Sequence, residues 1–170
     1  MDIYTIGHSN HTQEEFLDLL AKAKIEVLVD VRSNPNSRWA PFANRDILKD
    51  ILRAVQIRYI YLGDMLGGHP SDSDSYDPRS GKVNYQKIQE KEYFKSGLKR
   101  ILSGSIKYRV CIMCAEEDPT LCHRNLLVAA SLRQEGAKIF HIRGDGRIQT
   151  NEEFWKEQAG VAASQYSLPL

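Results

Sequence analysis

The chain has 170 residues, of which 42% are hydrophobic and 26% are charged, and this composition is typical of a globular domain with a real core. The formal net charge of +1 excludes a strongly basic protein that binds nucleic acid through bulk charge. No apolar run approaches the roughly 20 residues that span a bilayer, and the first residues lack a signal-peptide pattern. Three cysteines, an odd number, argue against a disulfide framework, so we expect a cytoplasmic protein with reduced thiols and no membrane contact.

Strand and helix periodicities alternate along the chain. We predict strands over 3–6, 26–31, 58–62, 109–113 and 138–142, and helices after Thr12, over 46–55, over 85–103, over 119–135 and after Thr150. Thr12 with Glu15, and Thr150 with Glu153, are capping-box pairs. The alternation predicts a single α/β domain over residues 1–170. Its sheet should be open, mainly parallel and three-layered, with about five strands and with helices on both faces.

The segment 63–84 does not fit this alternation. It is a polar run rich in Gly, Ser, Asp and Pro. Loops of this length without secondary structure are uncommon in compact domains and are often lids or binding segments. We therefore treat 63–84 as a candidate lid, with Tyr76 and Arg79 as candidate contact residues and plain disorder as the alternative.

The most informative segment is 113–124, which carries two thiols, three acids, an imidazole and a guanidinium. Asp118 is a good N-cap and Pro119 suits the first helical position, so a helix should begin there. His123 and Arg124 then fall near the positive end of the helix dipole, where a cation costs about 0.3–1 kcal/mol. Such breaches of local rules tend to occur at functional sites. The alternative is that both side chains point into solvent or onto the acids.

Polar side chains follow every predicted strand, at the edge where open parallel sheets bind their ligands. Because any such sheet has polar loops there, the residue types carry more weight than polarity alone. The candidate catalytic residues are Glu116, Asp30, His8 and Cys114. The candidate substrate-binding residues are Arg32, Ser33, Ser37, Arg38, Cys122, His123, Arg124 and Gly63.

The charged candidates indicate two kinds of chemistry. Arg32 and Arg38 flank a short turn, and a guanidinium fork suits phosphate or carboxylate. Asp30 and Glu116 suit acid/base or nucleophilic work, which hydrolysis of an N-glycosidic or phosphoester bond would need. The alternatives are structural: Arg32 would pair with Asp30 or Glu116, and Arg38 would lie in solvent.

Cys111 and Cys114 are spaced as C-x-x-C, but residues three apart on a strand face opposite sides, so we expect Cys111 in the core. Cys114 and Cys122 fall where they can approach each other. Zinc bound by these two and a histidine is an alternative, but the second C-x-x-C of a strong zinc signature is missing, so we predict no cofactor and no metal ligands. Three acids after Cys114 disfavour chemistry of the rhodanese or cysteine-phosphatase type, because they would repel an anion.

A series of motifs in order between residues 3 and 146 is specific to one family. The motifs are Thr5-Ile6-Gly7-His8-Ser9, Leu28-Val29-Asp30-Val31-Arg32-Ser33, Pro35 with Ser37-Arg38, Pro41-Phe42, Tyr61-Leu62-Gly63, Leu66-Gly67-Gly68, Met113-Cys114-Ala115-Glu116 and Cys122-His123-Arg124. With these motifs the chain resembles the prokaryotic family catalogued as domain of unknown function 488. The resemblance implies an uncharacterised soluble domain and brings no established activity.

Three hypotheses about function follow. The first is an enzyme, a hydrolase or transferase, that acts on a small anionic, nucleotide-like or otherwise phosphate-bearing ligand while 63–84 closes over the site. The second is a module that binds nucleic acid or a partner protein. The third is a thiol redox or metal-binding protein that uses Cys114 and Cys122. The substrate, the strand order and the oligomeric state stay open.

Overall fold

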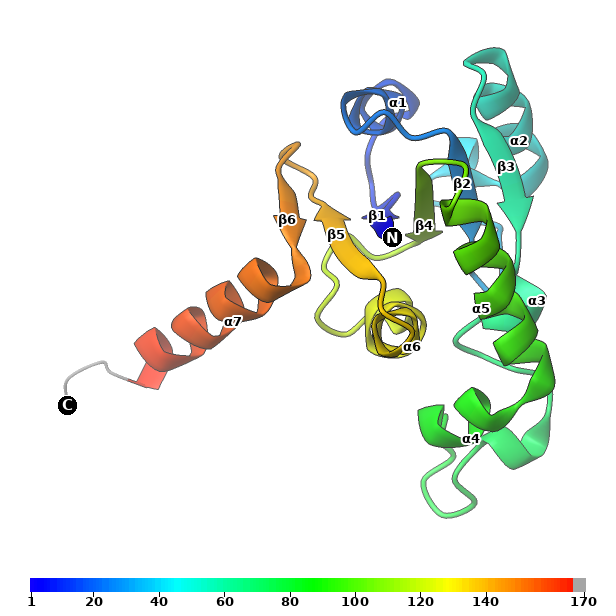
Figure 1. Ribbon diagram of the computed structural model, residues 1–170, viewed down its shortest axis with the longest axis vertical. Coiled ribbons are helices and arrows are strands. Elements are labelled where there is room, and N and C mark those ends of the chain that lie inside the picture. The colour runs from blue at the N-terminus through cyan, green and yellow to red at the C-terminus, as the bar shows by residue number, and fades with distance from the viewer. Residues whose placement is uncertain (167–170) are drawn as a thin grey trace.

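The computed structural model describes residues 1–166, and side chains up to residue 160. One sheet has the strand order β3-β2-β4-β1-β5-β6 (Figure 1). Its strands are β1 (Asp2–Gly7), β2 (Val27–Asp30), β3 (Arg58–Tyr61), β4 (Val110–Cys114), β5 (Lys138–Ile142) and β6 (Ile148–Thr150). Strands β1 to β5 are parallel, and β6 pairs antiparallel with β5. The predicted open, mainly parallel α/β sheet is confirmed, with six strands rather than about five.

Helices cover both faces of the sheet (Figure 1). They are α1 (Gln13–Lys22), α2 (Arg45–Ala54), α3 (Gly63–Leu66), α4 (Tyr85–Glu90), α5 (Glu92–Ser105), α6 (Ala130–Gln134) and α7 (Asn151–Tyr166), with the 3₁₀ turns η1 (Pro41–Ala43) and η2 (Ser73–Ser75) and the π-helical η3 (Arg124–Ala129). Side chains of α1 and α2 pack with Tyr4 and Leu28 on one face. Side chains of α5, η3 and α6 pack with Ile3 and Ile112 on the other. No helix among the described residues is long and apolar enough to cross a membrane.

The capping-box predictions are confirmed. Thr12 Oγ1 accepts from the Glu15 backbone N–H at 3.2 Å, and Glu15 Oε2 accepts from the Thr12 N–H at 2.7 Å. Thr150 and Glu153 make the same reciprocal pair at 3.1 Å and 2.8 Å. Each box satisfies two backbone donors that the first helical turn leaves free, and so places the beginnings of α1 and α7.

Two predicted helices are wrong in extent. The helix expected over 85–103 is two helices, because Lys91 between them has an extended ψ of 137°. The helix expected from Pro119 begins at Arg124 instead. The Asp118 carboxylate accepts from the backbone N–H of Thr120 at 2.8 Å and from its hydroxyl at 2.6 Å, which makes a local turn in place of the first helical turn. The chain between β4 and η3 is therefore a loop. The helix that follows it begins with the π-helical η3, and π-helical turns often mark functional sites.

The segment 63–84 is more ordered than its composition predicts. It contains α3 and η2, and Tyr76 forms an antiparallel bridge with Val83. Asp72 accepts from the Tyr93 hydroxyl at 2.8 Å and pairs with Lys91 at 3.3 Å. Both contacts join the segment to α5, because Tyr93 lies in its first turn and Lys91 directly precedes it. The segment is therefore ordered, and the lid role stays a prediction.

Candidate functional site

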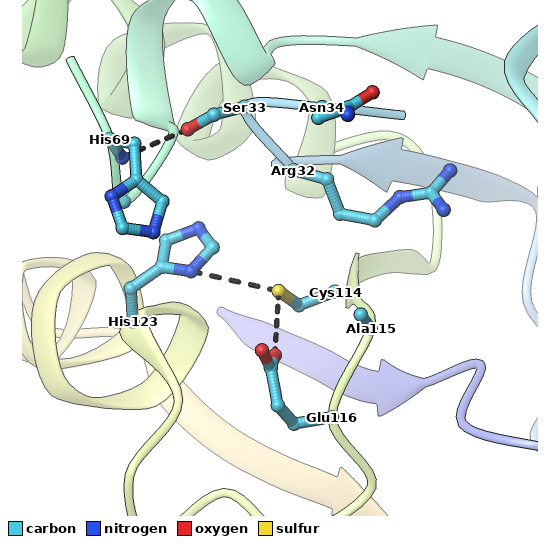
Figure 2. A pocket seen from close by; sticks show the side chains of 9 residues that line it. Arg32, Ser33, Asn34, His69, Cys114, Ala115, Glu116 and His123 are labelled. Atoms are coloured by element: carbon cyan, nitrogen blue, oxygen red, sulfur yellow. Dashed lines mark hydrogen bonds between the residues drawn. The ribbon is translucent and has the colours of Figure 1, made fainter. Parts of the chain in front are cut away.

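A cavity of about 330 Å³ lies beyond the carboxyl ends of β2 and β4, shown from close by in Figure 2. It is lined by Arg32, Ser33, Asn34, Gly68, His69, Cys114, Ala115, Glu116 and His123. Strands β2 and β4 are neighbours, with Asp30 in register with Met113, so the loops that follow them meet at one edge. This is the position at which open parallel sheets bind ligands.

The loop after β4 is held by β1 and by a buried arginine. The His8 backbone N–H donates to the Cys114 carbonyl oxygen at 3.0 Å and so continues the strand pairing past the end of the sheet. A Cβ on Gly7 would come within 1.8 Å of the Glu116 carbonyl oxygen, so the end of β1 needs a glycine there. The Arg124 guanidinium, 1% exposed, donates to the Glu116 carbonyl and, at 2.7 Å, to that of Glu117. Arg124 therefore fixes the backbone of this loop from its buried side.

Two thiols converge on one carboxylate oxygen. Cys114 Sγ and Cys122 Sγ each lie 3.0 Å from Glu116 Oε2 and donate to it. Burial alone would raise the pKa of Glu116, but the two thiol hydrogen bonds outweigh it and lower the pKa to about 2. The hydrogen bond with Cys114, together with burial, raises the pKa of Cys122. The cluster therefore carries its negative charge on Glu116 at neutral pH.

His123 completes the cluster. Figure 2 shows Cys114 between the Glu116 carboxylate and the His123 ring, whose Nδ1 lies 3.6 Å from the sulfur. Nε2 lies 2.9 Å from the Val31 carbonyl oxygen, which only accepts, so Nε2 carries a proton and Nδ1 is the ring nitrogen that faces Cys114. The ring packs on Gly68, where an added Cβ would come 2.8 Å from Cγ of the imidazole.

Asp30 and Arg32 form a buried ion pair beside the cavity. Asp30 accepts from Arg32 Nε at 2.9 Å and Nη2 at 2.6 Å, and from the Tyr59 hydroxyl at 2.7 Å. Arg32 Nη2 also donates to the Ala43 carbonyl oxygen at 2.7 Å. Arg32 Nη1 has no hydrogen-bond partner within residues 1–160. Both structural alternatives are found: Arg32 pairs with Asp30, which neutralises most of the charge that an anion would meet, and Arg38 is exposed to solvent.

His8 is buried and is not among the residues that line the cavity. It is 3% exposed, with Nδ1 3.0 Å from the Ser9 carbonyl oxygen, and its Nε2 finds no partner in the described part of the chain. Burial, and then the nearby Arg32 charge, lower the pKa of His8. The ring is therefore neutral at pH 7.

The structure thus gathers part of the predicted set. Five predicted residues line the cavity: Arg32, Ser33, Cys114, Glu116 and His123. Cys122 does not line the cavity, but its thiol donates to Glu116, which does. Gly63 is a packing position, because a Cβ there would come 2.0 Å from the Arg32 carbonyl oxygen. Ser37 and Arg38 line a separate hollow that shares Asn34 with the cavity. Cys111 is a fully buried core residue, as predicted, and burial raises the pKa of its thiol.

Sequence reasoning missed several cavity residues. His69 and Gly68 belong to a Gly-Gly-His run that is too short to be a signal on its own. The His69 backbone N–H donates to Ser33 Oγ at 2.9 Å, a contact that Figure 2 shows, and so joins the two loops. Tyr59 reaches Asp30 only because β3 pairs with β2.

Fold and site together define an open α/β domain with a thiol-carboxylate-imidazole cluster at the strand ends. The family model described as Domain of unknown function DUF488 matches residues 12–131, well over half of the chain, and the protein belongs to this family. Neither a curated protein nor a solved structure gives a significant match. The family confirms the resemblance and assigns no activity.

Proposed function

We propose that this protein is an enzyme, a hydrolase or transferase, that cleaves a bond in a nucleotide-like or otherwise phosphate-bearing substrate, with Glu116 as its reactive group. The observation that carries the proposal is an ionised carboxylate in the wall of the cavity, held by two thiols at 3.0 Å. Such a group attacks as a nucleophile or stabilises positive charge that develops in the transition state.

Glu116 is favoured over Cys114 for this role. Loss of the Cys114 proton would place a thiolate 3.0 Å from the Glu116 carboxylate, and two like charges at that distance repel strongly. The lowered pKa of Glu116, about 2, makes it a weak general base and suits nucleophilic or electrostatic work better. The His69 imidazole in the same wall supplies a candidate donor for a leaving group.

The anionic substrate class rests on the neighbouring basic residues. Arg32 lines the cavity, and Asp30 offsets most of its charge. Arg38 lies in the hollow next to the cavity, and the two share Asn34, so an elongated substrate that spans both would reach it. In this proposal Arg38 binds a terminal anionic group while the bond that breaks lies at Glu116, and 63–84 closes over the ligand.

The test is turnover on a panel of nucleosides, nucleotides and sugar phosphates, scored by release of base or phosphate. Glu116→Gln should lower kcat by at least about 100-fold, the lower range for a positioned catalytic group, with little change in KM. Arg38→Ala should raise KM with kcat nearly unchanged. Glu14→Gln, at an exposed position on α1, is the matched control and should behave as wild type. Unchanged kcat in Glu116→Gln would overturn the assignment.

One observation favours a second candidate, a nucleic-acid binding module. Trp39 is 92% exposed and follows Arg38 directly. Exposed aromatic rings beside arginines stack on bases of single strands. In that case Trp39→Ala should weaken binding of short single-stranded oligonucleotides, binding should fall steeply with salt, and Glu116→Gln should leave it unchanged.

A further inference from the structure

The cluster around Cys114 has the composition and spacing of a metal site. Cys114 Sγ, Cys122 Sγ and a ring nitrogen of His123 lie within 4.8 Å of one another, and Glu116 Oε2 touches both sulfurs. We propose that Cys114, Cys122 and His123 bind one Zn²⁺ ion, with two thiolates and one imidazole nitrogen as ligands. The proposal goes beyond the proposed function, because it holds whatever reaction the cavity supports.

The distance between Cys114 and His123 already fits a tetrahedral ion. Bonds of about 2.3 Å to sulfur and about 2.0–2.1 Å to nitrogen place the two ligand atoms about 3.6 Å apart at the tetrahedral angle. The observed separation of Cys114 Sγ and His123 Nδ1 is 3.6 Å. These two ligands therefore need no rearrangement to accept the ion.

Glu116 lies against the two sulfurs but outside the group of ligand atoms that one ion can join. Its Oε2 lies 3.0 Å from each sulfur, because each thiol proton bridges to the oxygen. Binding releases both thiol protons to solvent and puts the metal in their place. The fourth position of a tetrahedral ion stays open to water or a ligand from the cavity. No electrons are transferred in this exchange of two protons for one dication.

The groups around the ligands support the same site. A histidine that binds a metal usually donates its other ring N–H to a carbonyl or carboxylate oxygen, and His123 Nε2 lies 2.9 Å from the Val31 carbonyl oxygen. Gly68 packs against the ring, and Arg124 holds the backbone of Glu116. Cys114 and Cys122 are 3% and 2% exposed, so water reaches neither sulfur freely.

The ligand types select zinc over hard cations. Thiolates bind soft or borderline ions, whereas Mg²⁺ and Ca²⁺ prefer shells made of oxygen atoms. The sequence argument against zinc was the absence of a second C-x-x-C. The fold makes a second C-x-x-C unnecessary, because the loop between β4 and η3 brings Cys122 and His123 next to Cys114.

The test uses the whole reduced protein, stripped of metal with a chelator and then titrated with Co²⁺ as a spectroscopic probe, followed by displacement with Zn²⁺. We expect one ion per chain and an intense thiolate-to-cobalt charge-transfer band. Cys122→Ser and His123→Ala should each weaken binding by at least about 100-fold, since loss of outer-shell partners alone costs about 10- to 100-fold. Cys111→Ala is the matched control and should bind as wild type, because Cys111 is in the core.

Three outcomes would overturn the zinc site: no charge-transfer band in the reduced wild type, equal affinity in wild type and Cys122→Ser, or equal loss in Cys111→Ala. A Cys114–Cys122 disulfide in a protein whose reduced form binds no Co²⁺ would favour a thiol redox pair instead. Circular dichroism shows whether each variant is folded. Because the readout needs no substrate, failure of metal binding leaves the Glu116 proposal standing, and failure of turnover leaves the zinc site standing.

Discussion

Replacing Asp30 by asparagine tests how the site is held together. Asp30 is fully buried and Arg32 is 4% exposed, so the variant leaves a guanidinium in the interior without its counter-charge. Breaking a buried ion pair from one side costs about 3–5 kcal/mol. Domains of this kind have a total stability of about 5–15 kcal/mol, so the loss is a large fraction of it. The matched control is Asp18→Asn, whose partner Lys22 lies 2.6 Å away on an exposed helix face and contributes only about 0.3–0.5 kcal/mol.

Urea unfolding followed by circular dichroism measures both variants. We expect a lower midpoint for Asp30→Asn at an unchanged slope, and almost no change for Asp18→Asn. The double variant Asp30→Asn with Arg32→Met removes both charges, so it should be more stable than Asp30→Asn alone. It also gives a measurable protein if the single variant does not fold. A loss below about 1 kcal/mol in Asp30→Asn would refute the reasoning, because the ion pair would then not support the cavity wall.

Two further predictions concern buried histidine and close packing. Burial lowers the pKa of His141 to about 4, below the value of about 6.5 in the unfolded chain. The unfolded state therefore takes up this proton first, so stability should fall as pH drops from about 6.5 to about 4, by up to about 3 kcal/mol, and rise again on return to neutral pH. An NMR titration in which the His141 ring protonates near pH 6.5 would contradict this. Gly68→Ala should push the His123 ring aside, since the new Cβ would lie 2.8 Å from it, at a cost of about 1–3 kcal/mol in unfolding free energy and with weaker Co²⁺ binding. Gly160→Ala is the control, because no atom lies within 4 Å of its Cβ position, and equal losses in both variants would speak against the packing argument.

The site shows how a short loop becomes a chemical cluster. Residues 115–123 leave β4, turn at Asp118 and return to η3, so that both ends of the loop face the same carboxylate. Arg124 fixes the loop backbone from the inside, and Gly7 lets β1 approach it. Groups held in this way change position little when a ligand arrives, which is the condition for a preorganised site.

The sequence by itself determined most of the elements and the edge at which the site lies. Apolar runs and capping boxes act within a few residues, so five strands, the beginnings of α1 and α7, and the core position of Cys111 were predictable. Polar residues after each strand also placed Arg32, Cys114 and Glu116 at the correct edge, because all parallel strands end on the same side. The short β6 was missed, since its three residues carry too little periodicity to distinguish a strand from a turn.

Only the tertiary structure decided which of these residues meet. The order β3-β2-β4-β1 puts the ends of β2 and β4 side by side, so the loop after Arg32 faces the loop after Cys114, and Arg38 lies in the next hollow. The choice of Asp30 as the partner of Arg32, the convergence of two thiols on Glu116, and the contact of His69 with this edge all depend on segments far apart in the chain. Periodicity and caps act along the chain and say nothing about distance across the sheet, so this information becomes available only when the strands are paired.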